Sequence, residues 1–375
     1  MNIAVNTKLL IKDRLEGIGW FEHETLSRIT RAHPEHKFYF VFDRKWDESF
    51  MFSDNVFPLR TLIPSRHPLL WYLRFHHIIP HLLRNLDIDL FFSPDGYNLP
   101  PPVKSVIALH DLNYLHFPEN LPPAARWYYR RYFPAYARNA TRLVTVSQYS
   151  RNDISGSYGI DPERIDVVYN GVSEVFRPLD EKEKADVKMK YAAGKPYFVF
   201  VGALNPRKNL DRLLLAFEKF CRRGQSDAKL LIVGSPMFRS HFFRVGNASE
   251  GTEDRIAFLG RLPRQELARV VGGAMSLVLP STFEGFGIPI IEAMACDVPV
   301  ITSNTTSMPE VAGDAALLVD PYSVDSISDG LSAMALDPEL QAGLIARGRK
   351  QRERFSWDKT ADLLWSCLEK ALGPT

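Results

Sequence analysis

Short apolar runs alternate with segments of helical spacing along the first half of the chain. The apolar runs predict strands in residues 2–10, 37–42, 89–93, 105–110, 142–147 and 166–170. The segments of helical spacing are residues 20–32, 69–85 and 125–140, where apolar positions recur at the period of an amphipathic helix. Alternating strands and helices predict a parallel sheet that is covered by helices on both faces.

A second series of the same kind follows a charged stretch. Its predicted strands are residues 197–202, 229–234, 256–260, 276–280, 299–302 and 315–319. We therefore expect the α/β fold class, with two doubly wound, Rossmann-like domains in residues 1–178 and 196–355 and with ligands near the carboxyl ends of the strands. The charged residues 179–195 fit a connector, with a possible short helix within them. Residues 356–373 have helical spacing and could pack on either domain, including back on the first.

Composition narrows the class of protein only broadly. The 375 residues are 45% hydrophobic and 24% charged, as expected for globular domains with sizeable cores. A formal net charge of +2 argues against an extended nucleic-acid surface. Cys221, Cys296 and Cys367 form no CxxC pair, so neither a disulfide framework nor a structural zinc site is expected. No signal-peptide pattern and no apolar run of membrane-spanning length occurs, which favours a cytoplasmic protein.

Two carboxylates flank a glycine-rich turn within residues 281–295. Glu284 precedes Gly285 and Gly287, and Glu292 lies in the predicted helix that follows. Small residues let a ligand approach the backbone, and a helix N-terminus favours negative charge. The plainer interpretation is a capping Glu284 and a solvated Glu292. The whole segment is more typical of a nucleotide-sugar site, in which acids accept hydrogen bonds from sugar hydroxyls.

Two adjacent cations, Arg207 and Lys208, follow the first strand of the second series, which ends near Gly202. Cations beside a helix N-terminus can neutralise a diphosphate, and they do so more strongly as charge develops on a leaving group. A solvated basic turn is the alternative. Their place at a strand end favours a binding function.

Polar and small residues also follow strands in the first half. His110 and Asp111 come at the carboxyl end of a predicted strand, where sites in such sheets collect. A capping Asp111 and a satisfied histidine are the alternative. Gly17 and Gly19 lie in a predicted loop before the first helix and could let a diphosphate or an acceptor approach the helix N-terminus.

Residues 281–295 resemble the signature of glycosyltransferase family 4, retaining enzymes with the two-domain GT-B fold, in which two Rossmann-like domains face each other across a cleft. The resemblance implies that Glu292 binds the ribose of the donor and that Glu284 contacts hydroxyls of the transferred sugar. It also implies that the amides at Gly285, Phe286 and Gly287 face the sugar or the diphosphate.

The same resemblance assigns roles to the other motifs. Arg207 and Lys208 would hold the donor diphosphate, and transfer would need no metal ion or other cofactor, in keeping with the lack of an Asp-x-Asp motif. His110 would lie over the donor sugar, and the loop at Gly17 and Gly19 would close over the phosphates. The remaining candidates on the donor side are Gly202, Arg261, Leu262 and Ile288.

Three polar residues are candidates on the acceptor side. Asp111 follows His110. Ser147 could face the acceptor, although a helix cap is the better interpretation. Asn170 resembles a family turn beside the cleft, and a plain interdomain turn is equally compatible with the sequence.

Two segments mix arginine, histidine and aromatic residues, and they could lie on an anionic bilayer. They are residues 66–84 and 126–138. The alternative is that their apolar residues are core and their cations are solvated. If the two segments do lie on a bilayer, we expect a peripheral protein on the inner face of the cytoplasmic membrane.

The motifs together predict a metal-independent, retaining glycosyltransferase whose partners are a nucleotide sugar and a saccharide or lipid-linked acceptor, with no nucleic acid. GDP-mannose is the expected donor, because residues 110–122 resemble segments of bacterial mannosyltransferases that build surface polysaccharides. UDP-glucose or UDP-N-acetylglucosamine remain alternative donors. A GT-B sugar-nucleotide epimerase and a non-catalytic nucleotide-sugar binding protein are alternative functions. A dehydrogenase is disfavoured because the first predicted strand of neither series leads into a GxGxxG motif.

Overall fold

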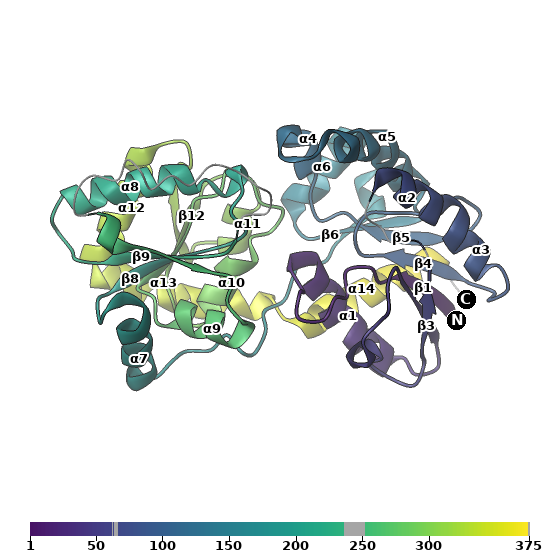
Figure 1. The fold of residues 1–375 in the computed structure, drawn as a ribbon, viewed down its shortest axis with the longest axis horizontal. Helices are drawn as coiled ribbons and strands as arrows, with labels where there is room; N and C mark the ends of the chain where they lie inside the picture. Colours follow the sequence, from purple (N-terminus) through teal and green to yellow (C-terminus); the bar gives the residue numbers. More distant parts are fainter. Residues whose placement is uncertain (62, 64–66, 236–251, 374–375) are drawn as a thin grey trace. The chain divides into compact units, whose positions relative to one another are not determined.

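The structure, a computed structural model, describes residues 1–61, 63, 67–235 and 252–373. It divides the chain into two compact units (Figure 1). The first unit is Met1–Asn170 with Trp357–Thr375, and the second is Gly171–Ser356. The chain thus leaves the first unit at Asn170 rather than at residue 178, soon after its last strand ends. Two parallel sheets flanked by helices confirm the expected α/β fold class.

The first unit contains a seven-stranded parallel sheet. Its strands are β1 (Asn2–Asn6), β2 (Lys37–Phe42), β3 (Val56–Arg60), β4 (Leu90–Ser93), β5 (Ser105–Ala108), β6 (Arg142–Thr145) and β7 (Ile165–Val167). They are ordered β3-β2-β1-β4-β5-β6-β7. Strand β3 was not expected from the sequence. It contains Pro58 and lies at the edge of the sheet, where a missing N–H is tolerated.

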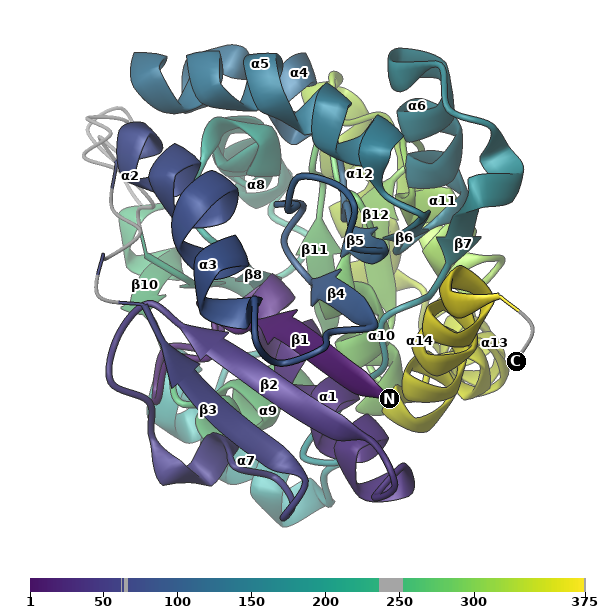
Figure 2. The same ribbon diagram turned by 90° about the vertical axis from the view of Figure 1, so that its right-hand side faces the viewer.

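Helices cover both faces of this sheet. One face packs against α1 (Gly17–Ala32) and α14 (Trp357–Leu372). The opposite face packs against α2 (Pro68–Leu73), α3 (Ile79–Leu83), α5 (Pro123–Asn139) and α6 (Gln148–Tyr158), and the short α4 (Asn113–His116) follows β5. In Figure 2 the yellow α14 lies beside the purple α1, although they come from the two ends of the chain. The C-terminal helix therefore packs on the first unit.

The segment expected as one helix over residues 69–85 is interrupted. Between α2 and α3 the backbone forms a π-helical turn, Arg74–Ile78. Pro80 lies in the first turn of α3, and a proline removes a donor and clashes with the carbonyl one turn earlier. A widened turn accommodates this clash, and it contains Arg74, whose side chain is fully buried.

The second unit contains a six-stranded parallel sheet in the order β10-β9-β8-β11-β12-β13. Its strands are β8 (Tyr197–Val201), β9 (Lys229–Val233), β10 (Ile256–Gly260), β11 (Ser276–Leu279), β12 (Val300–Ser303) and β13 (Ala316–Val319). Its helices are α7 (Glu181–Ala192), α8 (Leu210–Arg222), α9 (Arg264–Gly272), α10 (Ile288–Ala295), α11 (Met308–Ala312), α12 (Val324–Leu336) and α13 (Pro338–Gln351). The apolar faces of α8 and α12 form the core on one side of this sheet.

Two local expectations differ from the structure. The charged stretch 179–195 is part of the second unit rather than a separate connector, and its possible short helix is α7, which buries Val187 and Ala192. A reciprocal capping box between Asp180 and Glu183 starts this helix and satisfies its first amides. Helix α1 begins at Gly17, so Gly17 and Gly19 occupy its first turn instead of a preceding loop.

Adjacent leucines in α14 test its role in the first unit. Leu364 is 0% exposed and Leu363 is 46% exposed. We expect Leu364→Ala to lower the free energy of unfolding by about 2–5 kcal/mol because it opens a cavity in the core. Leu363→Ala should change it by less than about 1 kcal/mol. Urea unfolding of both variants measures the difference, and equal losses would contradict this account of α14.

Candidate functional site

Three charged side chains from two loops meet at the carboxyl edge of the second sheet. Arg207 and Lys208 form a short 3₁₀ turn after β8, and Glu284 follows β11. Strands β8 and β11 are parallel neighbours, so their carboxyl ends lie together. Arg207 Nη1 donates to Glu284 Oε2 at 2.8 Å, and Lys208 Nζ lies 2.6 Å from Glu284 Oε1. The structure thus joins three predicted site residues in one ion-paired cluster, the donor triad.

Further hydrogen bonds tie the two loops to each other. Thr282 N donates to Arg207 O at 2.8 Å, and Arg207 Nη1 also donates to Phe283 O at 2.9 Å. Asn209 adopts a positive φ of 60° and its side-chain amide donates to Pro280 O at 2.9 Å. The loop after β8 is therefore fixed to the loop after β11 through both backbone and side chains.

Lys208 is held in place by its neighbours as well. Its side chain is only 9% exposed. Gly202 makes room for it, because a Cβ there would lie 3.0 Å from Lys208 Cε. This packing explains a small residue at the end of β8, and it places Gly202 beside the donor triad.

Glu284 stays ionised although it is buried. Burial alone would raise the pKa of its carboxyl, but the charges of Lys208 and Arg207 outweigh it and lower the pKa to about 2. Two cations and one carboxylate leave the donor triad with a net charge of +1. The triad therefore combines attraction for an anion with an acceptor for hydroxyl groups.

Glu292 lies in a different environment on α10. Burial raises the pKa of its carboxyl to about 7, and the opposite charges of Arg264 and Lys208 offset this only in part. Within residues 252–373 and the other described ranges, the Glu292 carboxylate accepts no hydrogen bond. It differs from Glu284, whose charge is fully compensated by the protein.

The turn between the two glutamates starts α10. Gly287 is the N-cap of this helix with φ of 92°, and a Cβ there would lie 3.0 Å from Ile290 Cδ1. Gly285 is buried, and Ile288 is the first residue of the helix. Phe286 is 4% exposed and packs edge-on against Phe355, so its side chain supports the turn.

Other predicted donor residues lie away from the triad. Arg261 and Leu262 follow β10, and the strand β9 separates β10 from β8. In the first unit, Gly17 is exposed and Gly19 is buried. The structure leaves little space for a side chain at Gly19. A Cβ at Gly19 would lie 3.2 Å from Leu9 O.

The first-unit candidates are distributed over three elements. His110 follows β5, and its Nε2 lies 2.9 Å from Pro94 O; Asp111 Oδ1 accepts from Asn113 N at 2.9 Å. Ser147 caps α6 by accepting from Ser150 N at 3.1 Å, as the capping interpretation predicts. Asn170 is 3% exposed at the boundary of the unit.

A second buried charged cluster was not predicted from the sequence. Lys8 and Asp95 follow β1 and β4, and their ion pair spans 2.8 Å. Glu22 and Arg74 are both 0% exposed nearby; burial raises the pKa of Glu22 well above its usual value and lowers that of Arg74 to about 10. For Lys8 and Asp95 the available signal was a charged residue close after a run of apolar residues, whereas Glu22 and Arg74 lie in α1 and in the π-helical turn.

The group of described residues that could hold a metal ion lies in the first unit, not at the donor triad. His33, Glu35 and His36, after the end of α1, are the group whose ligand atoms lie close enough to share an ion. They are not part of the donor triad. In the described part of the chain, no helix is long and apolar enough to cross a membrane.

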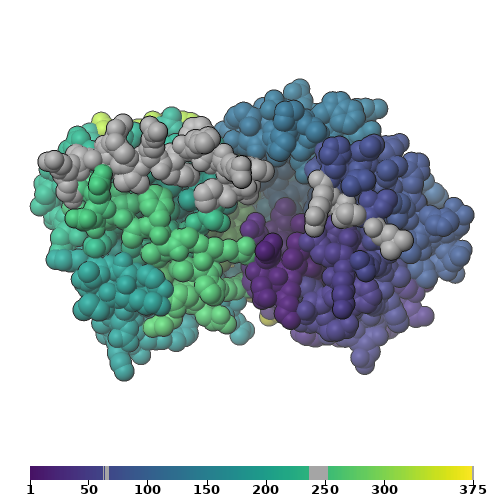
Figure 3. Space-filling model, viewed as in Figure 1, coloured from purple at the N-terminus to yellow at the C-terminus, as the bar shows by residue number. Residues whose placement is uncertain are grey.

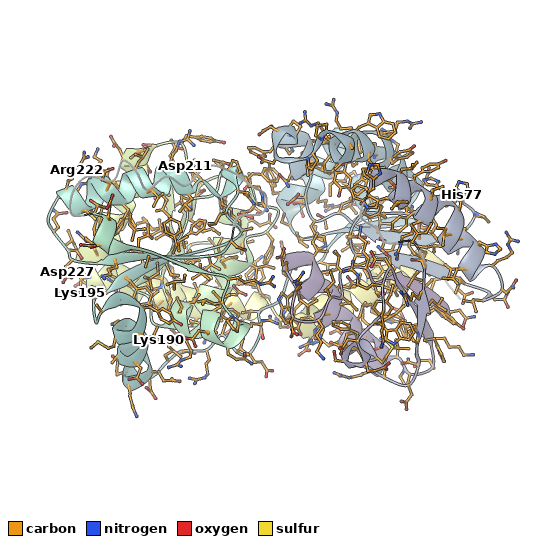
Figure 4. All side chains as sticks on the ribbon, viewed as in Figure 1. His77, Lys190, Lys195, Asp211, Arg222 and Asp227 are labelled. Carbon is orange, nitrogen blue, oxygen red and sulfur yellow. The ribbon has the colours of Figure 1, made fainter. Side chains whose placement is uncertain are left out.

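A shallow surface hollow in the second unit also lies apart from the triad. Its lining includes Lys195, Asp227 and Arg255, and the first two are labelled in Figure 4. These residues precede β8, β9 and β10, at the amino ends of the strands. The hollow is therefore at the sheet edge opposite to Glu284.

Comparison with known proteins adds a family to this geometry. The family described as "Glycosyl transferases group 1" matches residues 181–351, and "Glycosyltransferase Family 4" matches residues 29–175. The O-antigen chain mannosyltransferase B of Escherichia coli is 31% identical over 277 residues, which cover 74% of this chain and 73% of that protein. The O-antigen chain mannosyltransferase RfbU of Salmonella typhimurium is 26% identical over 304 residues, 81% of this chain and 80% of that protein.

Solved structures agree on the fold. A glycosyltransferase from Rickettsia africae superposes with a TM-score of 0.75 at 16% identity, covering 100% of this chain and 99% of that one. At this identity the likeness concerns the fold alone. With the paired parallel sheets it establishes the GT-B architecture.

The pH dependence of stability tests the donor triad. Because the folded pKa of Glu284 lies near 2, below its usual value of 4.5, its stabilisation is present above pH 4.5 and is lost as the pH falls towards 2. This shift in the pKa of Glu284 corresponds to a contribution of roughly 3 kcal/mol to the free energy of unfolding. We expect the gap in unfolding free energy between wild type and Glu284→Gln to shrink by about 1 kcal/mol between neutral pH and about pH 3.5. Urea unfolding across this range measures it, and a constant gap would argue against a buried ionised Glu284.

Proposed function

This chain belongs to the group 1 and family 4 glycosyltransferases, and on that premise we propose that it moves mannose from GDP-mannose to a saccharide or lipid-linked saccharide acceptor, with retention of anomeric configuration. Two relatives named as O-antigen chain mannosyltransferases support mannose as the transferred sugar. Retention is inferred from the resemblance of residues 281–295 to family 4. The donor triad is the observation that carries the proposal, because it places two cations and an acid at one strand edge.

In the proposed reaction, the bond between the anomeric carbon and the phosphate oxygen breaks while the acceptor oxygen bonds to that carbon from the same face. Arg207 and Lys208 stabilise the charge that develops on the departing diphosphate. The acceptor hydroxyl passes its proton to that phosphate. The two side chains supply positive charge where it is needed, so we propose that transfer requires no metal ion, and activity should survive EDTA.

The glutamates take different parts in this proposal. Glu284, held between the cations, orients hydroxyls of the transferred sugar. Glu292, whose carboxylate accepts no hydrogen bond from the described residues, accepts hydrogen bonds from the ribose. Ribose hydroxyls donate best to an ionised acid, so donor binding should favour the deprotonated form of Glu292. From the resemblance to family 4, we assign to His110 the role of positioning the transferred sugar.

Single substitutions test the assignment of the triad. With GDP-mannose and an oligosaccharide or lipid-linked acceptor, Arg207→Ala and Glu284→Gln should each lower kcat by on the order of 10²–10³-fold, as expected for loss of one preorganised electrostatic contact. Arg222→Ala is the matched control, because Arg222 is exposed on α8 (Figure 4) and, among the described residues, pairs with Glu218 of the same helix. Release of GDP and the anomeric configuration of the product by NMR give the readouts.

Binding measurements separate the roles and the donors. Glu292→Gln should weaken GDP and GDP-mannose alike, whereas Glu284→Gln, which releases both cations, should bind GDP at least as tightly as wild type. Thermal stabilisation by UDP-glucose or UDP-N-acetylglucosamine, but not by GDP-mannose, would overturn the choice of donor. Full transfer activity in both Arg207→Ala and Glu284→Gln would refute the site.

We also propose that the first unit contacts anionic membrane through α2 and α5. These helices pack against each other, and in Figures 2 and 3 the dark-blue α2 lies next to the lighter-blue α5. Leu69 on α2 is 62% exposed and Trp127 on α5 is 61% exposed. Arg130 and Arg131 are exposed on α5, and a basic, aromatic surface suits an anionic bilayer. These positions fall within the segments 66–84 and 126–138; residue 66 lies outside the described residues.

Sedimentation with anionic liposomes tests this contact. Leu69→Glu and Trp127→Glu should reduce the bound fraction several-fold. Each variant replaces an exposed apolar side chain with a negative charge, which the anionic lipid headgroups repel. Met189→Glu is the control, since Met189 is 68% exposed on α7 of the second unit. Equal binding of all three variants and wild type would contradict the proposed surface.

A further inference from the structure

Three adjacent strands of the first sheet deliver charged or titratable side chains to one edge. Strands β1, β4 and β5 are neighbours in the sheet order, and all are parallel. Lys8 follows β1, Asp95 follows β4 and His110 follows β5. The carboxyl ends of these strands therefore bring together three residues that are far apart in the sequence.

Asp95 is the centre of the hydrogen bonds at this edge. Its side chain is 5% exposed. Its Oδ1 accepts from Asn6 Nδ2 at 2.8 Å and from Ser93 Oγ at 2.9 Å, and its Oδ2 lies 2.8 Å from Lys8 Nζ. The Lys8 ammonium also lies 3.6 Å from the centre of the Tyr97 ring, a cation–π contact. Asp95 thus ties the turn after β4 to the end of β1.

The turn that Asp95 anchors is tightly packed. Gly96 has φ of 84°, and a Cβ there would lie 2.7 Å from Leu109 Cδ2 and 2.8 Å from Phe133 Cε1. Such a turn has little room to move once both of its ends are fixed. The carbonyl of Pro94, one residue before Asp95, is consequently held in one direction.

That carbonyl determines the protonation of His110. His110 Nε2 lies 2.9 Å from Pro94 O, and a carbonyl only accepts, so Nε2 carries the proton. Burial lowers the pKa of His110, although Pro94, Asp111 and Asp95 oppose the shift, so the ring is neutral at pH 7. Nδ1 then has the lone pair, and among the described residues it has no hydrogen-bond partner. The Phe21 ring, 5.0 Å away and edge-on, fixes the plane of the imidazole.

We propose that Asp95 is a positioning residue for His110: it holds the Pro94 carbonyl that receives the Nε2 proton, and it thereby keeps Nδ1 as the hydrogen-bond acceptor of the imidazole. The catalytic part of this inference rests on the proposed function, in which His110 positions the donor sugar. The structural part, the tautomer of His110, does not depend on it.

NMR of the histidine rings tests the tautomer in the ligand-free protein. The His110 resonance is assigned by its loss in His110→Gln. Wild type should show the Nε2–H tautomer, and Asp95→Ala should show a mixture of both tautomers. Asp89→Ala is the matched control, because Asp89 is an exposed carboxylate at the amino end of the same strand. Asp95→Asn keeps an oxygen for Asn6 and Ser93 and should retain most of the wild-type signal.

Kinetics with GDP-mannose test the consequence for transfer. Asp95→Ala should lower kcat by on the order of 10²-fold with a smaller change in KM for the donor, since a displaced group near the reacting atoms costs rate more than binding. Asp95→Asn should restore most of kcat. If Asp95→Ala does not fold, Lys8→Met replaces it in both measurements, because it removes the charge that anchors Asp95.

The outcomes separate this inference from the proposed function. An unchanged Nε2–H tautomer in Asp95→Ala overturns the positioning role, whatever the activity. A tautomer shift in Asp95→Ala, or in Lys8→Met where it replaces that variant, supports it if Asp89→Ala shows none. This holds even if wild type fails to use GDP-mannose, which would count against the proposed function alone. A tautomer shift with unchanged kcat in an active enzyme overturns the catalytic part.

Discussion

A buried carboxylate shared by two cations organises the second unit. Removing an ionised acid from water costs several kcal/mol unless it is paired with good geometry. Glu284 keeps its charge because Arg207 and Lys208 approach it from a different loop at 2.8 and 2.6 Å. The same contacts confine two long, flexible cations to one arrangement. The three side chains are therefore preorganised by one another, and a ligand would not have to order them.

The parallel sheet makes this pairing possible. Strands β8 and β11 are neighbours although β9 and β10 come between them in the sequence, so two loops that are far apart in the chain emerge side by side. The first unit contains a similar ion pair, between Lys8 and Asp95, which follow the adjacent strands β1 and β4. In both units an ion pair across adjacent strand ends fixes a turn that carries other polar groups.

Features with a local signal in the sequence were predictable, and features that depend on tertiary contacts were not. The buried apolar runs predicted every strand of the second sheet and all but β3 of the first, where Pro58 shortens the pattern. Helix α7 was expected only as a possible short helix, because its stability comes from a cap and a few buried residues rather than from an apolar stripe. The strand-end positions of Arg207, Lys208 and Glu284 were enough to predict them as candidate site residues. Their mutual pairing was not, because it depends on strand order.

The pairing also changes the part that Glu284 can play in the proposed transfer. With one carboxylate between two cations, the attraction for a bound diphosphate is weaker than two unpaired cations would give. As the sugar leaves, the charge on the diphosphate grows, and its attraction to the preorganised Arg207 and Lys208 grows with it. The sugar ring becomes more positive at the same time, so its hydroxyls become stronger hydrogen-bond donors to the negative carboxylate of Glu284. Both changes strengthen contacts in the transition state more than in the ground state, which is the condition for raising kcat.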